Sequence, residues 1–178
     1  MAVEDEPEVY EDYPLSTVVV AVVLTLSIYG VGAYIVAPLG TAVVAMYLLY
    51  CTTLKLSMLR KACPDCWYYG RRCGFGKGLL AARLFPKGDP QRMAEREVTI
   101  KDLVPDFLVT LGPLLVGAIL LYMAFSWRVM GLLLLLAVLG FPCTGMLRGT
   151  MVCPHCKQRE IGCPAQKLFG ETAGDDAD

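Results

Sequence analysis

The stretch from Tyr13 to Leu54 reads YPLSTVVVAVVLTLSIYGVGAYIVAPLGTAVVAMYLLYCTTL and contains no Asp, Glu, Lys or Arg. A bilayer core about 30 Å thick is crossed by roughly 20 apolar residues of helix, so this stretch predicts two consecutive spans. Pro38 lies near its middle, and proline cannot continue the hydrogen-bond ladder of a helix. We therefore expect helices over 15–36 and 39–59, joined by a tight turn at 37–40 into an antiparallel hairpin.

Two later uncharged runs predict a second hairpin, one over Phe107–Trp127 and one over Val129–Leu147. Arg128 separates them, and an aromatic residue beside a cation is typical of the membrane surface. The composition agrees, because 56% of the residues are hydrophobic and 19% are charged. In soluble domains about 45–50% of the residues are apolar and about 25% are charged. We expect an all-α membrane protein with four transmembrane helices.

The polar segments complete the predicted organisation of the chain. The N-terminal segment is acidic and lacks Lys and Arg, unlike a secretory signal, so we expect the first span to stay in the mature protein. The division is an acidic tail (1–14), a transmembrane hairpin (15–59), a loop (60–106), a second hairpin (107–147) and a C-terminal segment with an acidic end (148–178).

The basic residues predict an orientation. With four spans, fifteen of the sixteen Lys and Arg residues fall on one side, and only Arg128 falls on the other. The positive-inside rule assigns the basic side to the cytoplasm. We expect a cell-membrane protein with both termini, the loop and the C-terminal segment in the cytoplasm.

Two cysteine triplets follow the hairpins: CPDCWYYGRRC (63–73) and CPHCKQREIGC (153–163), both with the pattern Cys-Pro-x-Cys-x6-Cys. Each triplet comes shortly after a Met-Leu-Arg sequence, and the first helix of each hairpin contains Val-Gly-Ala, whose small residues let helices approach closely. These matches predict a tandem duplication. Its two copies would be related by an approximate two-fold axis along the membrane normal.

The triplets are candidate metal ligands. Cytoplasmic thiols are normally reduced, and a Cys-x-x-Cys turn directs two sulfurs toward one tetrahedral zinc ion. We expect a zinc site of one or two ions, with an iron–sulfur cluster or no stable metal as alternatives, although neither common ferredoxin spacing occurs. His155 is expected to point outward rather than bind. The candidate ligands are Cys63, Cys66, Cys73, Cys153, Cys156 and Cys163.

The triplet spacing resembles the two halves of the binuclear zinc cluster of fungal transcription factors, in which six cysteines hold two zinc ions. The resemblance covers only the triplets. The long separation between them, residues 74–152, departs from that family, and we expect no binding of nucleic acid. The longer runs CPDCWYYGRRCGFGKG and CPHCKQREIGCPAQKLF resemble a group of small, uncharacterised prokaryotic multi-pass membrane proteins, which implies no particular activity.

Other features of the polar segments have simpler interpretations. A shared face of Leu79, Leu80, Leu84 and Phe85 predicts a short helix on the membrane surface. Residues 91–98 predict a brief solvated helix, and Thr99 with Asp102 predicts a capping box. The turn 74–78 is expected to lead from the triplet into the surface helix, and a phosphate-binding loop is a weaker interpretation. The trio Trp67–Tyr69 is expected to anchor at the interface. Weak candidates for lipid-headgroup contacts are Arg71, Arg72, Lys77 and Arg83.

Two further cysteines, Cys51 and Cys143, lie in the predicted helices, where packing is the expected role and a reactive or ligand thiol the alternative. The predicted spans carry no ionisable pair, and helix capping accounts for Asp102 and Asp106, which disfavours a transporter or lipid-modifying enzyme. The preferred function is a non-enzymatic, metal-stapled membrane module that binds a membrane or cytoplasmic protein. A membrane redox protein, either an iron–sulfur carrier or a thiol oxidoreductase, is the alternative.

Overall fold

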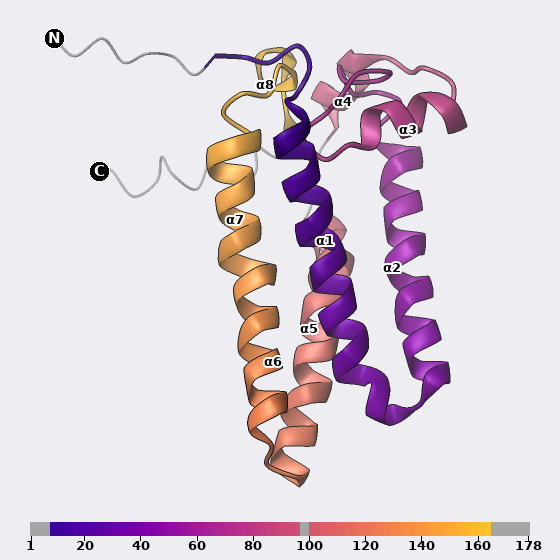
Figure 1. Cartoon of the computed structure of the whole chain (residues 1–178). Helices are drawn as coiled ribbons and strands as arrows, with labels where there is room; N and C mark the ends of the chain where they lie inside the picture. The colour runs from indigo at the N-terminus through magenta and orange to yellow at the C-terminus, as the bar shows by residue number, and fades with distance from the viewer. Residues whose placement is uncertain (1–7, 97–99, 165–178) are drawn as a thin grey trace, which may run out of the picture. The chain divides into compact units, whose positions relative to one another are not determined.

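A computed structural model of the chain describes residues 8–96 and 100–164 (Figure 1). In these ranges the regular structure is helical, and the only extended pairing is an isolated parallel bridge between Tyr10 and Cys156. Four helices are long and apolar enough to cross a membrane: Leu15–Leu39, Thr41–Lys61, Asp102–Met123 and Trp127–Val152. The predicted all-α class is confirmed, and the four helices of membrane-spanning length and composition fit a multi-pass membrane protein. The duplication and the side of the membrane stay predictions.

The first hairpin follows the predicted pattern closely. Helix α1 covers Leu15–Val36, and a 3-10 turn, η1, covers Ala37–Leu39 around Pro38. Gly40 has a φ of 112°, in the left-handed region that favours glycine, and its amide donates to the carbonyl of Ala37. Helix α2 therefore begins at Thr41, two residues later than predicted, and continues to Lys61.

The second hairpin differs from the prediction at both ends of its first helix. Helix α5 covers Ile100–Met123, so it begins well before Phe107 and contains Pro105 and Pro113. Asp102 lies in its first turn, where a negative side chain complements the helix dipole. The turn falls at residues 124–126, before Arg128. The predicted ends were wrong because an uncharged run marks the part of a helix that suits lipid, and a helix can extend beyond it.

The last span is one helical run with two π-helical stretches rather than a single regular helix. Helix α6 (Trp127–Val138) leads into η2 (Leu139–Cys143), α7 (Thr144–Met146) and η3 (Leu147–Val152). Pro142 lies in η2 and has no amide hydrogen to donate to the preceding turn, which favours a local widening of the helix. The Thr144 hydroxyl donates to the Leu139 carbonyl at 2.9 Å and supports the widened turn.

The polar segments, as far as the structure describes them, contain the short helices α3 (Lys77–Leu84), α4 (Pro90–Glu95) and α8 (Gln158–Ile161). The predicted helix at the leucine-rich stretch is confirmed as α3. The predicted helix over 91–98 begins one residue earlier, because the Asp89 side chain accepts from the amide of Gln91 and caps α4. Thr99 of the predicted capping box, residues 1–7 and the acidic C-terminal end lie outside the described residues.

The chain forms two compact units. The helical unit comprises Val20–Met58 and Thr99–Gly145, and the cysteine unit comprises Met1–Val19, Leu59–Val98 and Met146–Asp178. The helical unit thus holds most of both hairpins, and the cysteine unit holds the polar segments together with the helix ends at 15–19, 59–61 and 146–152.

The core of the helical unit draws on all four long helices, with Ile28, Ile35, Cys51, Val109 and Leu136 at its centre. The small residues of both Val-Gly-Ala sequences permit close approach, as predicted. A Cβ on Gly32 would strike the Tyr47 hydroxyl, and a Cβ on Gly117 would strike Leu133 of α6. Tyr47 donates through its hydroxyl to the Val109 carbonyl at 3.0 Å. Pro113, four residues after Val109, lacks the amide hydrogen that would otherwise bond this carbonyl.

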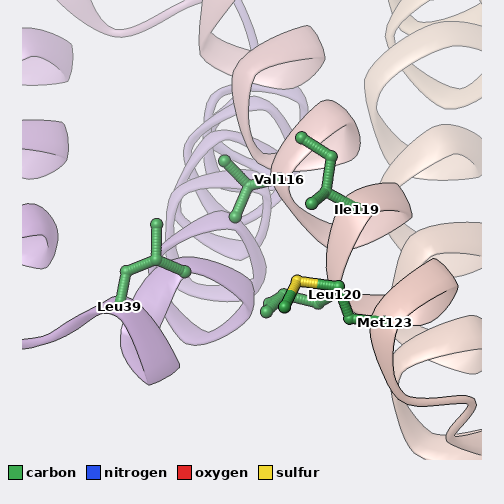
Figure 2. Close-up of a pocket in the computed structure, with 5 residues that line it drawn as sticks. All are labelled: Leu39, Val116, Ile119, Leu120 and Met123. Atoms are coloured by element: carbon green, nitrogen blue, oxygen red, sulfur yellow. The ribbon is translucent and has the colours of Figure 1, made fainter.

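A small pocket opens in the helical unit, with a volume of about 250 Å³ (Figure 2). Its lining is wholly apolar and consists of Leu39, Val116, Ile119, Leu120 and Met123. Such a surface suits lipid chains and offers no group that could orient a polar ligand.

Candidate cysteine site

The two triplets have the same backbone turns. The Cys66 amide donates to the Cys63 carbonyl at 3.3 Å, and the Cys156 amide donates to the Cys153 carbonyl at the same distance. The amide three residues after the second cysteine, in Tyr69 and Arg159, then donates to the carbonyl of that cysteine at 3.0 Å in both triplets. Proline after the first cysteine presets the turn. Equal spacing in the sequence therefore corresponds to equal local structure.

Backbone amides also point at the sulfurs. The amides of Tyr68 and Gln158, each two residues after the second cysteine, bond the thiols of Cys66 and Cys156. The Lys77 amide, at the start of α3, donates to the Cys73 sulfur at 3.1 Å. Amide donors stabilise a thiolate and hold it in place, as a metal-binding turn requires.

A reciprocal pair of hydrogen bonds joins the triplets. The amide of Trp67 donates to Oε1 of Gln158 at 2.8 Å, and the amide of Lys157 donates to the Tyr68 hydroxyl at 3.0 Å. In each bond the donor is the residue after the second cysteine, and the acceptor is the side chain two places after the second cysteine of the other triplet. Tyr68 and Gln158 are each only 2% exposed. The two turns therefore contact one another with approximate two-fold equivalence.

The N-terminal segment contacts both triplets from residue 8 onward. The Tyr13 hydroxyl donates to the Val152 carbonyl at 2.6 Å, and the Tyr68 hydroxyl donates to the Tyr10 carbonyl at 2.6 Å. The Tyr10 ring stacks on His155 with centroids 4.7 Å apart. Aromatic rings with hydroxyls can fill a small core and still satisfy their polar atoms.

Burial dominates the electrostatics of the thiols. It raises the pKa of Cys66 to about 12, and it also raises the pKa of Cys63, Cys153 and Cys156. Neighbouring thiols add to the shift because two nearby negative charges repel: Cys73 acts on Cys63, Cys163 acts on Cys153, and Cys156 acts across the interface on Cys66. Without a cation, these thiols are protonated at neutral pH.

The triplets do not form a closed metal centre in this structure. In residues 8–96 and 100–164, no group of three or more His, Cys, Asp and Glu side chains has an arrangement that could hold a metal ion. All eight cysteines are free thiols. The structure brings the two triplets together in one unit, while the predicted six-cysteine centre stays a prediction.

The two cysteines outside the triplets differ from one another. Cys51 is 1% exposed in the core of the helical unit, which supports the predicted packing role. Cys143 is half-buried in the π-helical stretch η2.

The glycine-rich turn after the first triplet has the expected structural role. Gly76 has a φ of 70° at the start of α3, and a Cβ on Gly74 would strike Val152. A Cβ on Gly78 would strike the carbonyls of Tyr68 and Arg71, so only glycine lets α3 lie against the triplet.

The prediction that Tyr68 anchors at the membrane interface was wrong. Tyr68 is buried, and its hydroxyl both donates to the Tyr10 carbonyl and accepts from the Lys157 amide. Trp67 supports the triplet contact as well, since Arg71 lies over its ring at 4.3 Å and Lys157 at 5.8 Å. The Tyr69 hydroxyl donates to the Phe85 carbonyl at 2.7 Å, which ties the triplet to the end of α3.

Two of the candidate lipid-binding cations have protein partners. Arg71 lies 3.8 Å from Glu11, and Arg72 lies 4.0 Å from Asp12. The Arg72 amide also donates to the Asp12 carboxylate at 2.8 Å. The N-terminal acidic residues therefore neutralise this part of the surface.

An ion pair lies within the helices of the helical unit, where the sequence predicted none. Lys55 of α2 and Asp106 of α5 are 3.9 Å apart, with side chains 30% and 35% exposed. The Lys55 ammonium also lies 5.7 Å from the centre of the Tyr29 ring. The assignment of Asp106 to a helix cap was wrong because α5 begins at Ile100 and places Asp106 in its second turn.

Sequence reasoning missed Tyr10, Tyr13, Tyr68 and Gln158 as the residues that join the triplets. Tyr68 and Gln158 could have been found by aligning the triplets, because they occupy the same position after the second cysteine. The roles of Tyr10 and Tyr13 have no signal in the sequence, since they depend on a contact between residues far apart in the chain. Comparison of the chain with protein-family models, curated proteins and solved structures gave no match.

Proposed function

We propose that the two triplets bind metal through their thiolates, and that the protein is a multi-pass membrane module whose cysteine unit is stapled by this metal. The observation that carries the proposal is the reciprocal pair of hydrogen bonds between the segments that follow Cys66 and Cys156. It pairs two equivalent cysteine turns, as a centre shared by two duplicated halves requires.

Zinc fits the donor set best. Cysteine thiolates are its preferred structural ligands, and amide-to-sulfur bonds are the usual support of such ligands. Binding would draw the thiols of the triplets closer and release their protons, and the positive charge of the metal ion would offset the repulsion between the resulting thiolates. The proposed ligands are Cys63, Cys66, Cys73, Cys153, Cys156 and Cys163, around one or two ions.

A metal staple also suits the size of the unit. The cysteine unit consists of three short chain segments, and small units commonly need a metal or disulfides for stability. In a reducing cytoplasm, where the positive-inside rule places this unit, metal is the available staple. The stapled surface would then bind a membrane or cytoplasmic protein partner, and no catalytic role is proposed.

The test is the metal content and absorption spectrum of anaerobically purified, detergent-solubilised protein without a His-tag. We expect a colourless protein with about two zinc ions per chain if all six cysteines bind. Cys73→Ser should then lower the zinc content, whereas Cys143→Ser, a matched control in the helices, should not. If the wild-type protein and Cys73→Ser both contain one zinc ion per chain, the ligands are restricted to the two Cys-Pro-x-Cys turns.

Two results would overturn the proposal. Iron with acid-labile sulfide would indicate an iron–sulfur electron carrier. Metal-free protein whose thiols oxidise readily to a disulfide would indicate a thiol oxidoreductase.

The reciprocal hydrogen bonds provide a separate test. Gln158→Ala removes the acceptor of the Trp67 amide and leaves a buried donor unsatisfied, at a cost of about 1–3 kcal/mol. We expect zinc to dissociate at least ten-fold faster in competition with a chelator. Gln91→Ala changes an exposed glutamine of the same unit and should leave the rate unchanged. Equal rates for the two variants would contradict the role of the paired turns.

A further inference from the structure

Helix α3 is held in one orientation by its face of small residues. Gly78 and Ala81 are buried, and Gly78 lies directly against the carbonyls of Tyr68 and Arg71. The Gly78 carbonyl accepts from the Gly70 amide at 3.1 Å, and the bond from Tyr69 to Phe85 fixes the end of the helix. The packing of this small-residue face therefore leaves the opposite face of α3 exposed.

That outward face is mainly apolar. Leu79, Leu80 and Leu84 are 50%, 49% and 54% exposed, and their spacing puts them on one side of the helix. Arg83 lies one helical turn from both Leu79 and Leu80, so the exposed side of α3 combines three leucines with one cation.

Two cations accompany the leucines: Arg83 lies on the same side of α3, and Lys87 follows three residues after the helix ends at Leu84. Arg83 and Lys87 are exposed, and neither has an ion pair with a residue in the described part of the chain. Arg71 and Arg72 differ, since Glu11 and Asp12 neutralise them. The uncompensated positive charge of this region therefore lies beside the leucine face.

Helix α3 follows a membrane-length helix closely along the chain. Helix α2 is one of the four helices that can cross a membrane, and only residues 62–76 separate its end at Lys61 from the start of α3. A second copy of the chain is a poorer occupant, because a two-fold contact between identical faces would bring Arg83 and Lys87 against their own copies.

We propose that α3 lies in the interface of the protein's own membrane, with Leu79, Leu80 and Leu84 among the acyl chains and Arg83 and Lys87 on anionic headgroups. Interfacial helices combine apolar residues with Lys and Arg, whose long side chains cover apolar surface while their charged ends reach the headgroups. The inference goes beyond the proposed function and does not depend on a bound metal.

The test uses a photo-crosslinking amino acid at position 80 or 84 in full-length protein in nanodiscs that contain anionic and zwitterionic lipid. We expect lipid adducts at both positions, with yields similar to that at Leu134, an exposed leucine of α6. Arg92, an exposed residue of α4, serves as the control position and should give few adducts.

The charges are tested in the same nanodiscs. With the crosslinker at position 80, Arg83→Gln and Lys87→Gln should each lower the ratio of anionic to zwitterionic lipid adducts about five-fold, since each cation near the surface favours anionic lipid. Yields at positions 80 and 84 no higher than at position 92 would overturn the proposal. Adducts to a second copy of the chain instead of lipid would also overturn it, in favour of a dimer contact.

Discussion

Tyr47→Phe isolates the energetic role of a hydroxyl inside the helical unit. The hydroxyl donates to the Val109 carbonyl at 3.0 Å, and Pro113 deprives that carbonyl of its usual partner in the helix. Hydrogen bonds between membrane helices contribute on average about 0.6 kcal/mol and at most about 1.7. We expect Tyr47→Phe to lower the free energy of unfolding by about 1–1.5 kcal/mol. This is near the upper end of the range for membrane helices, because no other donor replaces the hydroxyl.

The decisive comparison is a double-mutant cycle with Pro113→Ala. Alanine at position 113 supplies an amide that can bond the Val109 carbonyl, so Tyr47→Phe should then cost about 0.5 kcal/mol or less. The assay is reversible unfolding in mixed detergent micelles, followed by circular dichroism. Tyr34→Phe, at a tyrosine that is 68% exposed, is the matched control and should be neutral. An equal cost of Tyr47→Phe in both backgrounds would refute the argument that the proline creates the need for the hydroxyl.

Two further predictions concern the same unit and use the same assay. Gly32→Ala should destabilise it by about 1–3 kcal/mol, because the added Cβ meets the Tyr47 hydroxyl, whereas Gly30→Ala, which meets nothing within 4 Å, should be neutral or stabilising by up to about 1 kcal/mol. Equal effects at the two glycines would show that helix propensity, and not the close approach, decides. Lys55→Met and Asp106→Leu should each destabilise the unit, and the double variant should recover about 1 kcal/mol relative to the sum, because neither charge is then left alone. Strictly additive effects would mean that the ion pair contributes nothing to folding.

The elements that the sequence predicted well are those with strong local signals. The uncharged run from Tyr13 to Leu54 predicted the first hairpin almost to the residue, because Pro38 and Gly40 end helices through their own backbone chemistry. The spacing of the leucines predicted α3, because helical periodicity is also a local signal. The start of α5 was missed because Pro105 and two aspartates look like a loop, whereas the helix begins at Ile100 with Asp102 in its first turn and contains Pro105.

The ion pair and the π-helical stretches were outside the reach of the sequence pattern. Lys55 and Asp106 were counted at the edges of the spans, and nothing local indicates that each has a partner of opposite charge on another helix. Pro142 signals a disturbance of the last span, but the form that the disturbance takes depends on how the helix packs around it.

By itself, the sequence determined that the chain has four membrane-length helices, that two identical cysteine patterns follow the hairpins, and that small residues allow close helix contacts. These properties come from composition, periodicity and local backbone chemistry. An alignment of the triplets shows that Tyr68 and Gln158 are equivalent, but only the tertiary structure decided that they bond across the triplets and that Tyr10 and Tyr13 complete this small core. Those features arise from contacts between residues far apart in the chain, where burial and the satisfaction of polar groups select one arrangement that no local pattern encodes.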